Sequence, residues 1–225
     1  MDRLKQLKNQ YCQDLHQKDK QLFFLVALPR SGNTLFASII NQNPNVVCTA
    51  NSVTLEIIKN LHLLKQTDVF KNYPDYKSLD NVLDLVYDNY YKNWPQQYII
   101  DRGPVMTTGN FELIQKHYKR PFKCIVLVRD LMEVLASYIK WFENEPTAFP
   151  NRYANTIEDK LSLIMNSKGA VAKHLNAIKN AYNYPDICYF IKYDNLVINP
   201  KQCIQEVYKF LNIPYFEHKF TNLQQ

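Results

Sequence analysis

Short runs of consecutive apolar residues alternate along this chain with longer stretches of mixed character. The clearest runs are LFFLVAL at 22–28 and CIVLV at 124–128, and an arginine follows each within two residues. Unbroken apolar runs of this length are typical of strands that are covered on both faces. The predicted strands are 21–28, 46–48, 98–100, 124–128 and 187–193.

Between these runs, apolar residues recur at the three- and four-residue spacing of a helix with one buried face. In 79–93 they stand at positions 79, 82, 83, 86, 87 and 90. Residues 67–78 lack this spacing and are predicted to form a loop. The other predicted helices are 34–41, 53–65, 111–118, 131–142, 157–182 (one helix or two) and 201–211.

Strands that alternate with helices predict an α/β fold, a three-layer sandwich with a mainly parallel central sheet. We predict a single α/β domain over 21–225, preceded by an N-terminal helical arm at 1–20. In such folds, ligands bind beyond the carboxyl ends of the strands. Polar side chains stand at the predicted strand ends, and we expect them to converge there: Arg30, Asp101, Arg102, Arg129 and Tyr193.

The turn after the first strand has the sequence PRSGNTL at 29–35. It joins a buried strand to a helix, so backbone N–H groups and a helix N-terminus surround one point and form an anion site. The chain has only four glycines, and Gly32 is one of them. We therefore predict that Gly32 is required by the backbone geometry of the turn.

This turn differs from the P-loop that binds nucleoside triphosphates, which reads GxxxxGK[ST]. Asn33 stands at the position of the lysine, and Ala27 replaces the first glycine. Arg30 offers instead a planar fork of donors that suits phosphate or sulfate oxygens. A P-loop kinase of small molecules stays open as an alternative, but the missing lysine and the absence of a second Mg²⁺-binding carboxylate pattern argue against it.

Composition narrows the choice of partners. The net charge of +6 favours an anionic ligand, while the scattered lysines argue against a nucleic-acid partner. No apolar run approaches the length of about 18 residues that a membrane span needs. Residues 1–20 lack the apolar segment of a secretory signal, and the five cysteines form no CxxC pair. An odd number of cysteines without a signal predicts a reducing compartment, the cytoplasm.

Three sequence blocks together resemble the sulfotransferases that use 3′-phosphoadenosine-5′-phosphosulfate (PAPS). PRSGNTL at 29–35 is similar to the family's PRSGTTL loop, and Val128-Arg129-Asp130 with Ser137 is similar to its 3′-phosphate-binding element. IKYDNL at 191–196 with FLNIP at 210–214 is similar to the third block. The closest likeness is to the tyrosylprotein sulfotransferase and related microbial branch. The resemblance implies a P-loop nucleotide-binding type of fold, PAPS as donor, adenosine 3′,5′-bisphosphate (PAP) as product, and no metal.

The resemblance also implies roles for single residues. Arg30 and the N–H groups of the loop would hold the 5′-phosphosulfate, and Arg30 would offset charge on the leaving phosphate. Arg129 and Ser137 would bind the 3′-phosphate and so distinguish PAPS from ATP. The residues assigned to donor binding in this way are Arg30, Ser31, Gly32, Asn33, Thr34, Arg129, Ser137 and Tyr193.

The proton acceptor is where this sequence departs from the family. Asn51 stands where the tyrosylprotein branch has a glutamate, and an amide is no base near neutral pH. Glu56, one helical turn further on, is a substitute candidate. Arg102 replaces a catalytic lysine, and the neighbouring Asp101 is either the base or a partner that orients Arg102. The catalytic candidates are therefore Arg30, Asp101, Arg102 and Glu56.

Three questions stay open at the level of the sequence. The acceptor is an unidentified hydroxyl or amine, and Asn51 leaves room for a PAP-binding protein with impaired catalysis. The family usually continues past the position of Gln225 into a segment that covers the nucleotide. A minimal protein, a shortened chain, or closure of the site by residues 145–152 would each account for the difference.

Overall fold

A computed structural model of the chain describes residues 20–221, and the predicted arm at 1–20 lies almost wholly outside this range. Its centre is a parallel sheet with the strand order β2-β3-β1-β4-β5. This arrangement confirms the predicted α/β class and the predicted strands. The strands are β1 (Gln21–Ala27), β2 (Val46–Cys48), β3 (Tyr98–Arg102), β4 (Cys124–Val128) and β5 (Cys188–Lys192).

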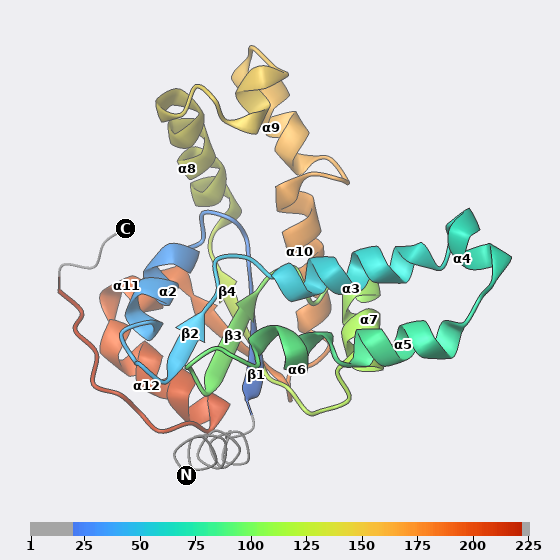
Figure 1. Cartoon of the computed structure of the whole chain (residues 1–225). Helices are drawn as coiled ribbons and strands as arrows, with labels where there is room; N and C mark the ends of the chain where they lie inside the picture. Colours follow the sequence, from blue (N-terminus) through green and yellow to red (C-terminus); the bar gives the residue numbers. More distant parts are fainter. Residues whose placement is uncertain (1–19, 222–225) are drawn as a thin grey trace, which may run out of the picture.

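Helices connect successive strands and cover both faces of the sheet (Figure 1). Among the described residues, no helix is long and apolar enough to cross a membrane. The helices are α2 (Asn33–Ile40), α3 (Val53–Leu64), α4 (Asp68–Asn72), α5 (Tyr76–Asp84), α6 (Val86–Tyr91), α7 (Thr108–His117), α8 (Leu131–Asn144), the 3₁₀ helix η1 (Phe149–Arg152), α9 (Ile157–Met165), α10 (Ala170–Ala181), α11 (Tyr193–Ile198) and α12 (Pro200–Leu211).

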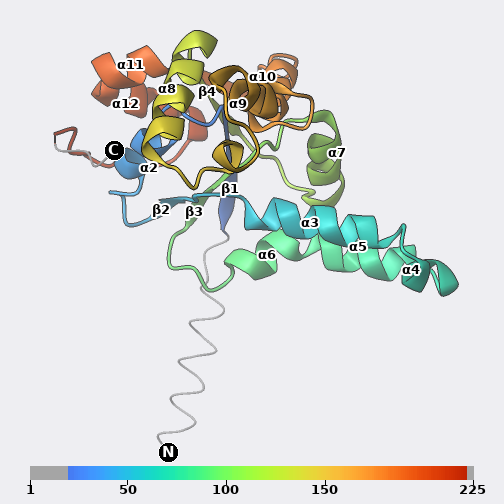
Figure 2. The ribbon, with the colours of Figure 1, turned by 90° about the horizontal axis from the view of Figure 1, so that it is seen from above.

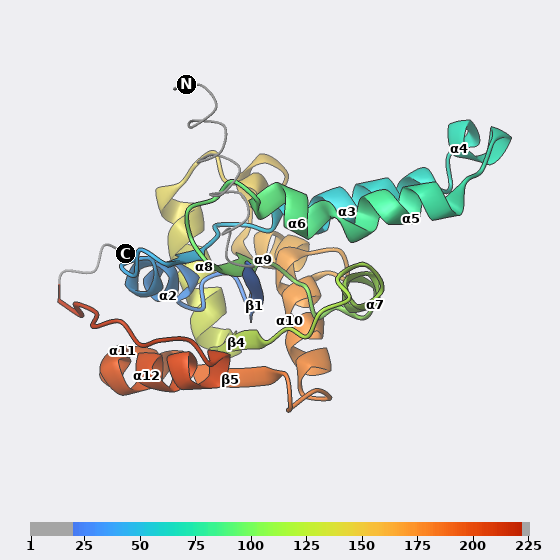
Figure 3. The ribbon, with the colours of Figure 1, turned by 60° about the horizontal axis from the view of Figure 1, so that its bottom comes forward.

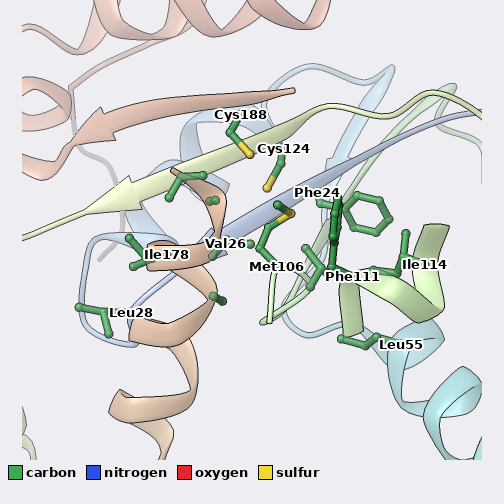
Figure 4. Close-up of a cluster of buried hydrophobic side chains, with 14 of the residues drawn as sticks. Phe24, Val26, Leu28, Leu55, Met106, Phe111, Ile114, Cys124, Ile178 and Cys188 are labelled. Carbon is green, nitrogen blue, oxygen red and sulfur yellow. The ribbon is translucent and has the colours of Figure 1, made fainter. Parts of the chain in front are cut away.

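The unbroken apolar run of β1 divides its side chains between two cores. Phe24 and Val26 lie in one core, with buried residues of α3, α7 and α10 (Figure 4). Phe23 and Leu25 point to the opposite face, into a second core that is closed by α2 and α12. Because side chains alternate between faces along a strand, both sets of positions must be apolar, which explains the unbroken run.

Two helix boundaries differ from the sequence-based prediction. The segment 67–78, predicted as a loop, contains α4 and the start of α5, where the Asp75 side chain accepts a hydrogen bond from the Ser78 N–H and caps the helix. The predicted helix 79–93 is divided into α5 and α6. Of the two alternatives for 157–182, the structure has two helices, and the turn between them requires glycine at Gly169, where a Cβ would stand 2.2 Å from the Ile164 carbonyl oxygen.

Helices α3, α4 and α5 extend well beyond the sheet as an arm (Figures 2 and 3). Only the first turn of α3 reaches the carboxyl edge of the strands, and Ser52 caps that turn by accepting from the Leu55 N–H. The loops that follow β1, β3 and β4 meet at the same edge. The architecture therefore brings the loop at 29–35, the start of α3 and the ends of β3 and β4 to one place.

Candidate active site

The loop after β1 turns sharply through two residues in the left-handed region. Arg30 has φ 69° and Gly32 has φ 89°. A left-handed conformation is costly for a residue with a side chain, so the surrounding structure must hold Arg30 in place. Arg129 supplies part of that support, because its Nη1 donates to the Arg30 carbonyl oxygen at 2.9 Å.

Gly32 satisfies two constraints at once. Its φ is one that L side chains rarely adopt, and a Cβ here would stand 2.6 Å from Cδ2 of Tyr193. Tyr193 begins α11, a short helix whose first turn lies against the loop. The prediction that the backbone geometry requires glycine at this position is therefore confirmed, and Tyr193 is a second reason that the sequence did not reveal.

The loop presents free backbone donors at the start of α2. The N–H groups of Gly32, Asn33 and Thr34 have no backbone acceptor among residues 20–221. Ser31 differs, because its N–H already donates to the Leu28 carbonyl oxygen at 3.2 Å. This N–H therefore closes the turn, and its role in holding the phosphosulfate stays a prediction.

Residues about a hundred positions apart meet beside this loop. Arg30 Nε donates to Ser137 Oγ at 3.1 Å, and the Arg129 guanidinium lies 4.1 Å from the centroid of the Tyr193 ring. Arg129 Nε also donates to Glu133 at 2.9 Å, one helical turn into α8. The structure thus brings together the arginine, the serine and the tyrosine that the sequence assigned to one site.

A cavity of about 480 Å³ opens over the loop. Among the residues that the structure describes, three guanidinium groups and no carboxylate line it, so its field favours an anion. Free backbone donors and positive charge together fit a nucleotide that carries phosphate groups. The lining residues are Pro29, Arg30, Gly32, Asn33, Thr34, Leu35, Arg102, Arg129, Ser137 and Tyr193.

A second cavity of about 390 Å³ lies beside the first, and we call the two the donor cavity and the side cavity. Both are lined by Pro29, Asn33 and Arg102, so Arg102 stands at their boundary. Burial lowers the pKa of Arg102. The side cavity is lined by Leu25, Ala27, Pro29, Asn33, Asn51, Ser52, Leu55, Glu56, Arg102, Gly103, Pro104, Lys173 and His174.

Asp101 does not reach either cavity. Its side chain is fully buried, and its carboxylate accepts hydrogen bonds from three hydroxyl groups, at 2.5 Å from Thr54, 2.6 Å from Ser52 and 3.1 Å from Thr49. Burial raises its pKa. No ion pair joins Asp101 to Arg102 in the described range. The geometry therefore favours neither sequence-based role for Asp101; the carboxylate ties β2, β3 and the start of α3 together.

Glu56 does line the side cavity, together with Asn51. Its side chain is 59% exposed and forms an ion pair with Lys59 at 2.8 Å. The sequence therefore placed Glu56 in the right region, although solvent and a lysine already satisfy much of its charge.

His174 is the residue of this region that sequence reasoning missed. It lies on α10 and lines the side cavity with Lys173. Its Nδ1 is 2.7 Å from the Ala170 carbonyl oxygen, one turn back on the same helix. No local motif marks this position, since its approach to the loop after β1 depends on how α10 packs against the sheet.

The fold and the donor cavity define an α/β protein with a P-loop-like turn adapted to a phosphate-bearing ligand. The sequence profile described as the sulfotransferase domain matches residues 20–225. The chain therefore belongs to the sulfotransferase family, and the resemblance proposed from the three sequence blocks is confirmed. Among the described residues, no cluster of three or more His, Cys, Asp or Glu side chains is placed to hold a metal ion.

Named relatives agree with this assignment. A Caenorhabditis briggsae protein that carries the name of a protein-tyrosine sulfotransferase is 25% identical over 205 residues, which is 87% of this chain and 67% of that protein. Nodulation protein H of Rhizobium tropici is 24% identical, over 89% of this chain and 78% of its own length. The fold is similar to that of a mouse sulfotransferase solved with PAP, at a TM-score of 0.55, 15% identity, 89% coverage of this chain and 63% of that one.

Proposed function

We propose that this sulfotransferase binds PAPS in the donor cavity and transfers its sulfuryl group to a hydroxyl or amine acceptor in the side cavity. The observation that carries the proposal is the shared boundary of the two cavities at Pro29, Asn33 and Arg102. A transferase must hold donor and acceptor next to each other, and adjacent cavities with one common cation meet that need.

The proposed donor contacts follow from the charges and free donors of the loop. Arg30, with the N–H groups of Gly32 to Thr34 and the Thr34 hydroxyl, would bind the 5′-phosphosulfate. Arg129 and Ser137 would bind the 3′-phosphate, which ATP lacks. A phosphate can join or replace Glu133 as the acceptor for Arg129, and Ser137, whose Oγ accepts from Arg30, keeps its own O–H to donate to a phosphate oxygen. The Tyr193 hydroxyl would donate a hydrogen bond to a phosphate oxygen.

Arg102 is proposed to act on the reacting group, because it alone of the three arginines faces both cavities. Sulfuryl transfer resembles phosphoryl transfer, an in-line displacement in which charge spreads over the peripheral oxygens. A fixed guanidinium at that point stabilises the charge as it develops. Arg30 would act from the donor side by offsetting charge on the oxygen that leaves with the nucleotide.

We also propose that the protein works in a reducing compartment such as the cytoplasm. All four cysteines of the described residues are free and buried. Burial raises the pKa of the Cys48 thiol to about 12, which keeps that thiol protonated and unreactive.

Ligand selectivity tests the proposed donor site. We expect PAP at about 100 times its dissociation constant to add roughly 2.7 kcal/mol of stability, or about 5–10 °C in Tm for a chain of this size. At the same concentration, 5′-AMP and ATP with Mg²⁺ should give much smaller shifts in Tm. Differential scanning calorimetry measures all three, and a radiolabelled PAPS assay with phenols, sugars and amines then identifies an acceptor.

Each result decides between the functions left open above. Equal shifts with PAP and 5′-AMP would contradict the 3′-phosphate site at Arg129 and Ser137. A preference for ATP with Mg²⁺ would favour a kinase. Selective PAP binding without transfer to any acceptor would support a nucleotide-binding protein with impaired catalysis, as Asn51 at the family's base position suggests.

A further inference from the structure

We propose that His174 is the general base that removes the proton from the acceptor, with Nε2 of its imidazole as the accepting atom. This assignment rests on the proposed sulfuryl transfer and deepens it. It gives the reaction a base that neither Asn51 nor the buried Asp101 can provide.

The position of His174 is the first argument. The residue lines the side cavity together with Arg102, and Arg102 also lines the donor cavity. An acceptor in the side cavity therefore shares that cavity with the imidazole and with the arginine that also lines the donor cavity. A general base must lie within hydrogen-bond reach of the proton it removes, and a cavity wall beside the transfer point meets that condition.

The tautomer is the second argument. A carbonyl oxygen only accepts hydrogen bonds, so the 2.7 Å contact with the Ala170 oxygen requires that Nδ1 carries a proton. In the neutral ring, Nε2 then carries the lone pair. Because Nδ1 is held against its own helix, the ring edge with Nε2 is turned away from that helix. Nε2 has no hydrogen-bond partner within residues 20–221, so its lone pair is available to a ligand.

The surrounding charges are the third argument. Burial, Lys173 on the same helix and Arg102 on β3 all lower the pKa of His174 below its usual value, while the bond to Ala170 acts in the opposite direction. The carboxylate that lines the same cavity is Glu56 on α3, which is paired with Lys59. At neutral pH the imidazole is therefore uncharged and able to accept a proton.

The rival groups are weaker for physical reasons. The oxygens of Asp101 already accept from three hydroxyls in the core, out of reach of any ligand. Glu56 is largely solvated, and a solvated carboxylate is a weak base at neutral pH. Among the side chains that line the side cavity, His174 combines partial burial, a fixed tautomer and a free lone pair.

The step balances without a further reactant. As the acceptor oxygen forms its bond to sulfur, the acceptor O–H proton passes to Nε2 of His174. The bond between sulfur and the 5′-phosphate oxygen of PAPS breaks, and that oxygen leaves with the electron pair as part of PAP. The imidazolium then releases its proton to solvent, which returns His174 to its neutral form.

The test compares His174→Asn with Glu56→Gln in the full chain. With PAPS and the best acceptor of the panel, we expect H174N to lower kcat/KM by about 100-fold or more, the usual contribution of a general base. The PAP dissociation constant, measured by titration calorimetry, should change by less than about twofold. The acidic limb of the wild-type kcat/KM profile should disappear in H174N and persist in E56Q.

A second measurement does not depend on turnover. In ¹⁵N-labelled protein with PAP bound, the His174 ring should titrate below its usual pKa and remain in the Nδ1–H tautomer at pH 7. A ring protonated at pH 7, or an Nε2–H tautomer, would overturn the assignment. So would an H174N variant that retains wild-type kcat/KM, or an E56Q variant that alone loses activity. A wild-type protein that fails to bind PAP or to transfer sulfuryl would instead overturn the proposed function itself, which keeps the two failures distinct.

Discussion

The donor cavity and the side cavity differ in how the chain builds them. Most of the donor cavity comes from one continuous loop, and its other residues stand at strand ends or on the helices that follow them. The side cavity is assembled from the end of β1, the start of α3, the end of β3 and the first half of α10. A local sequence therefore specifies the first, and tertiary packing specifies the second.

Their electrostatics differ as well. Within residues 20–221, three arginines and no carboxylate line the donor cavity, whereas the side cavity combines Arg102 and Lys173 with Glu56 and His174. A uniformly positive surface suits a ligand of fixed negative charge. Mixed ionisable groups suit proton transfer, which needs a group that changes charge near neutral pH. We therefore expect variants of the donor cavity to impair nucleotide binding, and variants of the side cavity to impair proton transfer.

The largest effect is expected from Gly32→Ala. The new Cβ would meet the Tyr193 ring at 2.6 Å while the backbone is held at φ 89°. The left-handed strain alone costs about 1–2 kcal/mol, and the clash adds to it. We expect a loss of about 2–4 kcal/mol in the free energy of unfolding, together with loss of PAP binding. Urea denaturation and titration calorimetry measure the two effects.

Gly109→Ala is the matched control for this variant. Gly109 lies in the first turn of α7, and a Cβ there meets nothing within 4 Å. Alanine should leave PAP binding intact and keep stability equal or raise it slightly. If G32A bound PAP like the wild type, the geometry of the loop would not define the donor cavity, and the contrast between the cavities would fail.

A smaller and more selective effect is expected from Arg129→Ala. Removing one charged hydrogen-bonding group from a phosphate typically costs about 1.5–3 kcal/mol, so the affinity for PAP should fall roughly 10- to 100-fold. Affinity for 5′-AMP should change little, because that nucleotide lacks the 3′-phosphate. Calorimetric titration with both nucleotides measures the ratio. An equal loss for both would mean that Arg129 acts only by holding the carbonyl of Arg30.

The sequence predicted most of the fold because five buried apolar runs define the sheet directly. It missed α4, α11 and the first turn of α5, because segments this short do not show a helical repeat of apolar residues. Asp75 shows the reason, because its capping side chain starts α5 within a stretch that has no helical spacing of apolar residues. Tyr193 shows a related failure, since the helix that begins there follows β5 without any intervening turn.

The candidate site also contains residues that the sequence predicted and residues that it did not. Arg30 and Arg129 were predicted because each follows a strand at the carboxyl edge of a parallel sheet, and Ser137 was predicted from the family resemblance. Neither the burial of Asp101 nor the approach of His174 could be predicted, because both depend on how α3 and α10 pack. Residues at strand ends can thus be predicted from the sequence, whereas a residue in the middle of a helix was predicted only where a family motif includes it.

The smallest effect is expected from Asp101→Asn. It concerns the pH dependence of stability, since Asp101 is buried in the core and lines neither cavity. Burial raises the pKa of Asp101 above its unfolded value, so the protonated form is favoured in the folded state. This contribution to stability is fully present below the unfolded pKa of 3.8 and is lost as the pH rises through the folded pKa. Asparagine has no such dependence. The stability of D101N relative to wild type should therefore increase from pH 3.5 to pH 7, as measured by urea denaturation.

Asp80→Asn provides a control of opposite sign. The Lys65 ammonium holds the pKa of Asp80 at about 2, so its carboxylate stabilises the fold above pH 3.8 and loses that effect as the pH falls toward 2. D80N should therefore become less stable relative to wild type as the pH rises. PAP binding should persist in D101N, because Asp101 lines neither cavity. If D101N instead lost PAP binding, the start of α3 would support the donor cavity too, and the two cavities would form one cooperative unit.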